Sequence, residues 1–257
     1  MTGRATDLET AMMTDDPAST ISGTIAVVDL SSKCRDEMFR LYERYYDAAD
    51  RDRFEHDLAE KKTVVLVRSG SGDIIGFSTI FIGRQNVDGA LVNYLFSGDT
   101  VLDASRWGDP VLLRAWFRAA GAVKASLGGG QLFWFSIMGG HRTFRILPNF
   151  FRQFFPAFDD HAAPDLARVR DRIAAARYGD HFDPETGLVD FGSSQGHLRQ
   201  QWAGVEETAV RNRHAAFFLR ANPFYFRGVE LACIAEFDLR NLKRYGATSF
   251  AEGMAQD

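Results

Sequence analysis

The chain has 257 residues, of which 46% are hydrophobic and 25% are charged, and its formal net charge is −4. This composition is ordinary for a globular protein and provides apolar mass for one sizeable core. The acidic balance excludes the global basic field that nucleic-acid binding uses. No apolar run approaches the roughly 18 residues of a membrane-spanning helix, so we expect no membrane span.

The two cysteines, Cys34 and Cys233, lie far apart and lack metal-ligand spacing. Two thiols in a chain of this length favour reduced cysteines in a cytoplasmic protein, with Cys233 in the core. Residues 1–22 are polar and lack the basic start and apolar stretch of a secretory signal, so we expect a disordered tail. The six histidines are scattered without zinc spacing, and no metal is expected.

A strand, two helices and a second strand are expected first. Alternating apolar residues predict a strand at 24–30. Ser31 and Ser32 can cap the first helix, and Asp50 can cap the second. The β-branched run at 63–67 predicts the next strand.

The pattern then predicts a three-strand antiparallel meander. Residues 69–73, Ser-Gly-Ser-Gly-Asp, form a hairpin loop before a strand at 74–82. Asp88-Gly89 predicts a type I′ turn, because both central residues of that turn need positive φ. The third strand begins at residue 90 and ends at 96 or at 102.

A helix follows the meander. Pro110 suits its first turn, apolar residues recur at helical spacing after it, and glycines 128–130 end it. Residues 131–138 predict a buried strand. A second helix is expected over 141–155, where Pro148 must kink or split it.

Residues 162–213 interrupt this order and are expected to be an insertion. Two closing strands are predicted after it, at 215–219 and 231–237, joined through Asn222-Pro223. Within the insertion the pattern predicts a helix at 165–177, a loop at 178–196 and a helix at 198–210.

This order of elements resembles that of the GNAT (GCN5-related N-acetyltransferase-like) N-acyltransferase superfamily, over residues 24–158 and 214–245. Residues 103–110, Asp-Ala-Ser-Arg-Trp-Gly-Asp-Pro, stand where that family carries its phosphate-binding loop. The resemblance implies an α/β (α+β) fold with a mixed, mostly antiparallel central sheet flanked by helices. One acyltransferase domain is then expected over residues 23–245, followed by a C-terminal tail at 246–257.

The resemblance also implies a donor site. In such proteins a pantetheine thioester lies in a splay between the fourth and fifth strands, and its phosphates meet the amino end of the next helix. The residues expected at the donor are Thr100, Val101, Leu102, Arg106, Trp107, Gly108, Asp109, Arg114 and Ser136.

The loop departs from the family pattern in a way that bears on the donor. Asp109 and Pro110 replace the second glycine, adding a negative charge and removing an N–H near the phosphates. These two changes should weaken the binding of a donor with one phosphate, such as an acyl-phosphopantetheine on acyl carrier protein, less than they weaken the binding of acyl-CoA. Acyl carrier proteins are acidic, so a basic patch on this protein could bind one. The arginines that could form such a patch could also simply lie on solvated helix faces. These are Arg114, Arg118, Arg142, Arg145 and Arg152.

An amine attacking a thioester must lose a proton, and the oxyanion must be stabilised. Asp99 is expected to point into the cleft as base or ammonium ligand, with Ser97 on the same face. His141 could act as acid or base, and Tyr94 could protonate the departing thiolate. Each also has a structural interpretation as a turn, helix-start or core residue. The same holds for Asn222 and Glu230, which could touch the acceptor.

These patterns predict an N-acyltransferase that moves an acyl group to a primary amine. The acceptor could be an amino acid, a polyamine, a lipid precursor or a peptide. The 22 phenylalanines favour a medium or long acyl chain if they line a slot, and otherwise form core. The alternatives are an acetyl-CoA-dependent N-acetyltransferase, a non-catalytic GNAT-fold binding module and RNA binding through Arg168, Arg170, Arg172 and Arg177, which the acidic charge disfavours.

Overall fold

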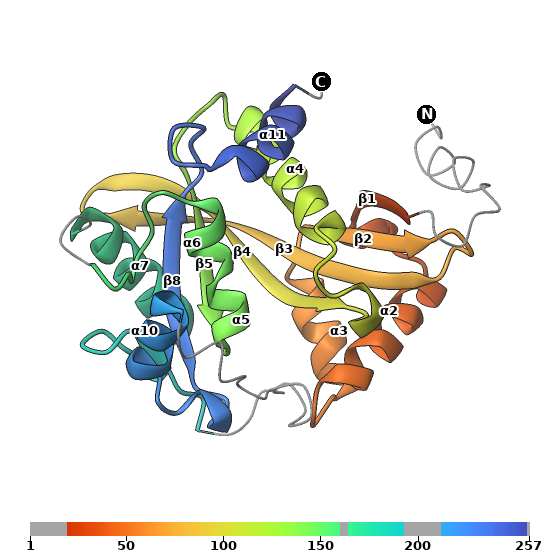
Figure 1. Cartoon of the computed structure of the whole chain (residues 1–257), viewed down its shortest axis with the longest axis horizontal. Coiled ribbons are helices and arrows are strands. Elements are labelled where there is room, and N and C mark those ends of the chain that lie inside the picture. The colour runs from red at the N-terminus through yellow and green to blue at the C-terminus, as the bar shows by residue number, and fades with distance from the viewer. Residues whose placement is uncertain (1–19, 160–163, 193–211, 256–257) are drawn as a thin grey trace.

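The structure is a computed structural model that describes residues 20–159, 164–192 and 212–255 (Figure 1). Within these residues one eight-stranded sheet runs in the order β1-β2-β3-β4-β5-β8-β7-β6. Neighbouring strands pair antiparallel except β4 and β5, which are parallel. The strands are β1 (Thr20–Ala26), β2 (Thr63–Ser69), β3 (Ile74–Val87), β4 (Ala90–Leu102), β5 (Leu132–Met138), β6 (Phe182–Asp183), β7 (Leu188–Val189) and β8 (Glu230–Glu236).

Helices cover both faces of the sheet. On one face, called here the α4 face, the side chains of Leu95 and Trp134 pack with α4, α5, α6, α10 and α11. On the other, the α2/α7 face, two separate clusters form: α2 and α3 pack around Phe77, and α7 packs around Phe135. The helices are α2 (Ser32–Tyr45), α3 (Arg51–Ala59), α4 (Val111–Ser126), α5 (His141–Phe144), α6 (Ile146–Phe150), α7 (Pro164–Tyr178), α10 (Arg213–Ala221) and α11 (Arg244–Met254).

The local signals in the first half are confirmed. The Ser31 hydroxyl accepts a hydrogen bond from the Cys34 amide, and the Asp50 carboxylate accepts one from the Arg53 amide. The turn after β3 has φ values of 51° at Asp88 and 90° at Gly89. Both cysteines are free and buried. Caps and turns are specified by neighbouring residues, which is why the sequence reveals them.

The first strand was misplaced, because β1 covers Thr20–Ala26 rather than 24–30. It pairs with β2 from Thr20 opposite Ser69 to Ala26 opposite Thr63, so it ends where its partner ends. The chain then forms a 3₁₀ turn at Val27–Asp29. Residues 20–22 therefore belong to the sheet, whereas the rest of the predicted tail lies outside the described residues.

The strand predicted at 215–219 is wrong, because these residues lie in α10. The Asn212 side chain accepts hydrogen bonds from the amides of His214 and Ala215 and so starts a helix. Ala215 and Phe218, one turn apart, are its buried side chains. The place beside β8 is taken by the β6–β7 hairpin, which lies in the predicted loop.

The remaining segments differ in detail. The helix predicted at 141–155 is split at Arg145 into α5 and α6, and the chain is extended from Phe151. The helix predicted at 165–177 is α7, and the one at 198–210 lies outside the described residues. Most of the predicted C-terminal tail forms α11, whose Gly253 lies against the backbone of α4.

Candidate active site

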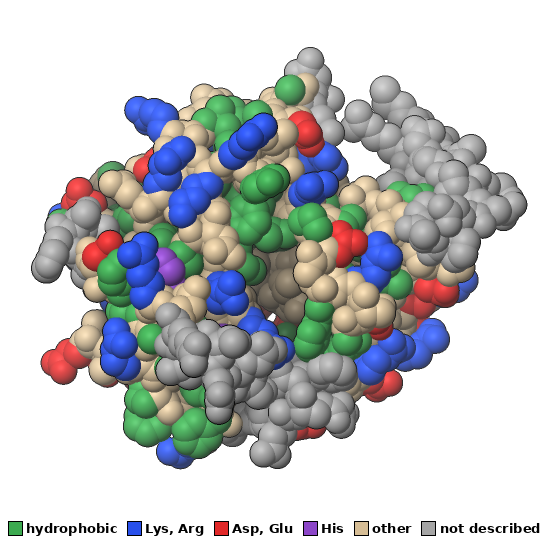
Figure 2. Space-filling model, in the orientation of Figure 1, with side chains coloured by type: hydrophobic (Ala, Val, Ile, Leu, Met, Phe, Trp, Pro, Cys, Tyr) green, Lys and Arg blue, Asp and Glu red, His purple; other side chains and the backbone are tan. Residues whose placement is uncertain are grey.

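The strands β4 and β5 part in the middle of the sheet. They pair only from Asn93 opposite Leu132 to Phe96 opposite Phe135. Beyond that point β4 follows β3 and β5 follows β8. We call the gap between residues 97–102 and 136–138 the wedge. Figure 2 shows a hollow over β4, between α5 and the loop that leads to α4, so the opening expected from the resemblance is present.

A β-bulge in β4 lies at the start of the wedge. Ser78 pairs with Thr100 and Ile80 with Ser97, so Gly98 and Asp99 together oppose Thr79. The bulge overturns the expectation that Ser97 and Asp99 share a face. Ser97 accepts a hydrogen bond of 3.0 Å from Trp134 Nε1 on the α4 face.

Asp99 instead faces the α2/α7 side. Its charge acts on Lys61 and on Tyr42 and Tyr46 of the α2 end. Burial raises the pKa of Asp99 to about 6, although the Lys61 ammonium opposes the rise. The Lys61 ammonium donates to the Asp57 carbonyl at 2.8 Å, and burial lowers the pKa of Lys61.

Glu230 is the functional candidate whose importance the sequence did not reveal. It is the first residue of β8, beside the end of β5, where Leu231 pairs with Met138. A Cβ placed at Gly139 would lie 3.5 Å from its Oε1. Burial raises the pKa of Glu230 to about 7, and the charge of Asp99 adds to the rise. Asp99 thus stands on β4 at the wedge, and Glu230 stands on β8, on the far side of β5.

Tyrosine hydroxyls surround the same space. The Tyr46 hydroxyl donates to the Thr100 carbonyl at 3.4 Å. Burial raises the pKa of Tyr46, and the charges of Asp99 and Glu230 raise it further. Burial also raises the pKa of Tyr178, where Arg177 opposes and Glu230 adds to the effect. These phenols stay protonated at neutral pH and can donate hydrogen bonds.

The residues predicted to bind the thioester donor do not all lie on the same face of the sheet. Ser136 is buried on β5, and its hydroxyl donates to the Ile137 carbonyl at 3.4 Å. Thr100 forms a 2.8 Å hydrogen bond with Ser78, whereas Val101 is buried in the α2 core. The Trp107 indole donates to the Leu102 carbonyl at 2.9 Å, which ties the loop to the strand end.

In the loop before α4, the Asp109 carboxylate already binds the groups that could bind a phosphate. Asp109 Oδ1 accepts from the Val111 amide at 2.9 Å, and Oδ2 pairs with Arg106 at 2.9 Å. Arg106 also donates to the Thr20 hydroxyl at 2.6 Å. Gly108 has a φ of 92°, which favours glycine. An amide at the helix start and the nearest guanidinium, the two groups that a phosphate uses, are therefore already engaged.

One contact spans the mouth of the wedge. The Arg142 guanidinium of α5 lies 5.5 Å from the centre of the Trp107 ring. His141, the first residue of α5, is buried rather than facing solvent. Tyr94 is also buried, beside Phe81 and Phe135, where β4 and β5 are still paired. The catalytic roles of His141, Tyr94 and Ser97 stay predictions.

The other predicted features are structural. The rings of Phe133, Phe135, Phe144 and Phe151 are buried among core side chains, so they form core. On α7, Arg168 and Arg172 pair with Asp88 and Arg170 is buried, so these residues do not form an open basic face. Arg118 of α4 pairs with Glu252, whereas Arg114 is exposed.

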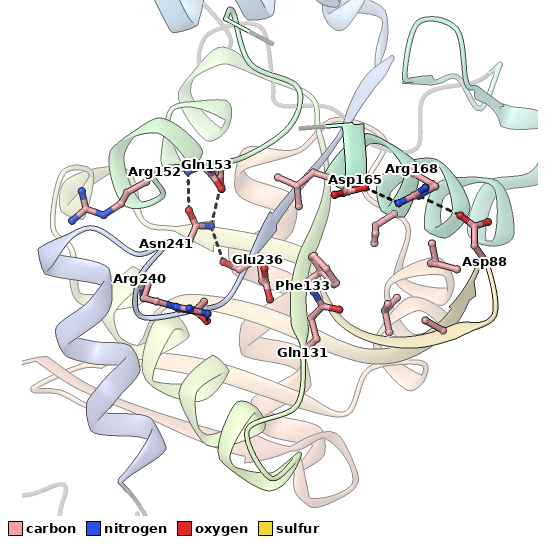
Figure 3. A pocket seen from close by; sticks show the side chains of 16 residues that line it. Asp88, Gln131, Phe133, Arg152, Gln153, Asp165, Arg168, Glu236, Arg240 and Asn241 are labelled. Carbon is pink, nitrogen blue, oxygen red and sulfur yellow. Dashed lines mark hydrogen bonds and ion pairs between the residues drawn. The ribbon is translucent and has the colours of Figure 1, made fainter. Parts of the chain in front are cut away.

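A pocket of about 900 Å³ lies at the other end of β4 and β5, where the strands begin (Figure 3). Its charged side chains largely satisfy one another: Arg168 pairs with Asp88 and Asp165, and Asn241 bonds to the carbonyls of Gln153 and Glu236. It holds none of the predicted site residues.

Among the described residues no group of three His, Cys, Asp or Glu side chains could hold a metal ion, and no helix of the described parts is long and apolar enough to cross a membrane.

No protein-family model and no curated protein matches the chain. Three solved structures are similar to it. A conserved protein of unknown function from Enterococcus faecalis, a probable N-acyltransferase, is 13% identical with a TM-score of 0.41, over 53% of this chain and 33% of that one. The GNAT family N-acetyltransferase YhbS from Escherichia coli, in complex with CoA, is 14% identical with a TM-score of 0.38, over 54% and 72%. Saccharomyces cerevisiae N-myristoyltransferase with bound myristoyl-CoA is 16% identical with a TM-score of 0.34, over 49% and 32%.

The ligands and activities named for these proteins are theirs. In the first and third comparisons the matched region is about a third of the other protein's length. The strand order of this chain, with a meander, a helix and a parallel fifth strand that parts from the fourth, is the order that the resemblance implied.

Proposed function

We propose that the protein is an N-acyltransferase that moves an acyl group from a pantetheine thioester to a primary amine. The observation that carries the proposal is the wedge, with Asp99 and Glu230 at its α2/α7 side. A pantetheine arm can lie along the edge of β4 beyond Phe96 and take up the backbone hydrogen bonds that β5 no longer offers, as an added strand does. The thioester then lies between the two faces of the sheet.

In the proposed reaction the amine nitrogen bonds to the carbonyl carbon, the C–S bond breaks, and the thiol leaves with the proton that the amine gives up. Backbone N–H groups at the β4 edge stabilise the oxyanion. Asp99 accepts the ammonium proton, because a carboxyl group with a pKa of about 6 is largely ionised at neutral pH yet basic enough to take it. Glu230 holds the ammonium beside it.

We propose a donor with a single phosphate, an acyl-phosphopantetheine on an acidic carrier protein, over acyl-CoA. The support is Asp109, which engages both the Val111 amide and Arg106. Lys and Arg side chains also gather around the upper ends of α4, α6 and α11 (Figure 2). These elements and their flanks carry Arg114, Arg118, Arg145, Arg152 and Arg244.

A donor panel tests the proposal. The protein is incubated with amines and with acetyl, octanoyl or palmitoyl groups on CoA or on carrier protein, and thiol release and product mass are measured. We expect Asp99→Asn to lower kcat/KM by about 100-fold, with the exposed Glu185→Gln as unchanged control. Faster turnover of longer chains supports the medium or long acyl group that the sequence predicts. Acetyl-CoA as the best donor supports the acetyltransferase instead. Thiol release unchanged by Asp99→Asn and Glu230→Gln removes these carboxylates from the mechanism, and thiol release no faster than without the protein leaves a binding module.

A further inference from the structure

Arg177, at the end of α7, is a charged side chain that has no ion-pair partner among the residues that the structure describes. Its guanidinium lies 4.5 Å from the ring centres of both Phe81 and Phe96. Its Nε is buried without a hydrogen-bond partner, as is the hydroxyl of the neighbouring Tyr178. Among the described residues no carboxylate forms an ion pair with it, unlike Arg168 and Arg172 on the same helix.

Burying a guanidinium without an anionic partner costs free energy. Taking a guanidinium out of water is unfavourable, and the faces of two aromatic rings recover only part of the loss. The side chain keeps some exposure, so an anion can reach it. The neutral hydroxyls of Tyr94 and Tyr178 lie beside the guanidinium, and an anion that bonded to it would balance the charge that these groups leave uncompensated.

The position of Arg177 relates it to the proposed acceptor site. Phe96 is the last β4 residue paired with β5, and the Lys61 ammonium lies 5.9 Å from the centre of the same ring. Two cations therefore flank the ring at the start of the wedge. Asp99 follows three residues later in β4, and Tyr178 feels the charges of both Arg177 and Glu230. Positive and negative groups thus lie near one another on the α2/α7 face.

We propose that the acceptor is an amine that also carries a carboxylate, such as an amino acid, and that Arg177 binds the carboxylate while Asp99 and Glu230 hold the amine. This inference rests on the proposed function and narrows its acceptor. A polyamine or a simple alkylamine would leave the guanidinium unpaired and place no anion near Lys61. An amino acid satisfies both ends of the site.

The test compares each of several amino acids with its carboxamide and with the amine that lacks the carboxyl group, with the best donor of the panel. We expect kcat/KM to be at least about tenfold higher for the amino acid. Arg177→Met is expected to lower the value for the amino acid by about tenfold or more and to leave the carboxamide within about twofold. Arg172→Met on the same helix, exposed and paired with Asp88, is the matched control.

Equal use of amino acid and carboxamide by the wild type would overturn the inference while leaving N-acyl transfer intact. An equal loss for both acceptors in Arg177→Met, at unchanged melting temperature, would also overturn it, because Arg177 would then only hold α7 on the sheet. If Arg177→Met does not fold, the inference is tested with Arg177→Lys and with the preference of the wild-type protein for the amino acid over its carboxamide. Acylation of no amine at all would instead remove the proposed function.

Discussion

The charge of Asp99 on β4 acts on Glu230 on β8 and adds to the effect of burial in raising the pKa of Glu230 to about 7. The pKa of Asp99 itself is raised to about 6. Two carboxyl groups in this state titrate together, in steps that belong to the pair. Transfer should therefore be lost as the pH falls through about 7 to 6, because the base must be ionised to take the ammonium proton. A pH profile of kcat/KM checks this, and Asp99→Asn should leave a limb from the single ionisation of Glu230, shifted to lower pH because the Asp99 charge is gone; a profile flat from pH 5 to 8 would contradict it.

The same two groups should make the protein less stable at high pH. A carboxyl group whose pKa is higher in the folded state binds more protons folded than unfolded, so stability falls as the pH rises from its ordinary pKa near 4 towards 6 or 7. We therefore expect Asp99→Asn and Glu230→Gln to raise the free energy of unfolding at pH 8, each by on the order of 1–3 kcal/mol, and to have little effect at pH 4. Urea titrations at both values measure this. Destabilisation at pH 8 would mean that the charged groups are held by favourable partners.

Removing the Asp109 carboxylate should strengthen CoA binding. Asp109→Ala frees the Val111 amide and Arg106 for a phosphate, so we expect the Kd for CoA to fall by about threefold to tenfold. Loss of the hydrogen bond from the Val111 amide should cost about 1 kcal/mol of stability. Calorimetric titration of wild type, Asp109→Ala and the exposed control Glu185→Gln measures the change. Weaker CoA binding in Asp109→Ala would show that the carboxylate organises the loop for the donor.

Thr79 offers a stability test at the bulge. Its side chain is 1% exposed, and its hydroxyl has no hydrogen-bond partner. Replacing a buried unpaired hydroxyl with a methyl group of similar shape removes an unmet desolvation cost. Thr79→Val should therefore raise the free energy of unfolding by about 0.5–2 kcal/mol. A loss of stability in urea titrations would contradict this and point to a partner such as bound water.

Gly98 should not tolerate a side chain. A Cβ there would lie 2.5 Å from Thr79 Oγ1 and 2.7 Å from Lys61 Cε. Because the Lys61 chain would have to move away from Phe96 and Asp99, Gly98→Ala should lower kcat/KM by about tenfold or more and destabilise by about 1–3 kcal/mol. Thr79→Ala in the same chain removes one of the two obstacles and should restore part of the loss. An unchanged rate in Gly98→Ala would mean that Lys61 has no role in placing the reactants.

Much of this fold could be predicted because its signals are local. Ser31, Asp50 and the Asp88-Gly89 turn act through neighbouring residues. The site could be predicted only in part, because it depends on distant pairings. Glu230 reaches the wedge only because β8 pairs with β5. The bulge at Gly98 and Asp99 depends on the register with β3, and one extra residue sends Ser97 and Asp99 to opposite faces. Arg177 looked like one member of a basic helix, and only the packing on Phe81 and Phe96 sets it apart.

The parting of β4 from β5 also bears on the order of events in the proposed reaction. A slot that passes through a sheet lets one reactant arrive from each side, and neither has to leave before the other comes in. Ser97, the hydroxyl at its apex, already serves the Trp134 indole and is poorly placed to carry the acyl group in between. Both substrates should then be bound at once, and double-reciprocal plots at several amine concentrations should intersect rather than run parallel.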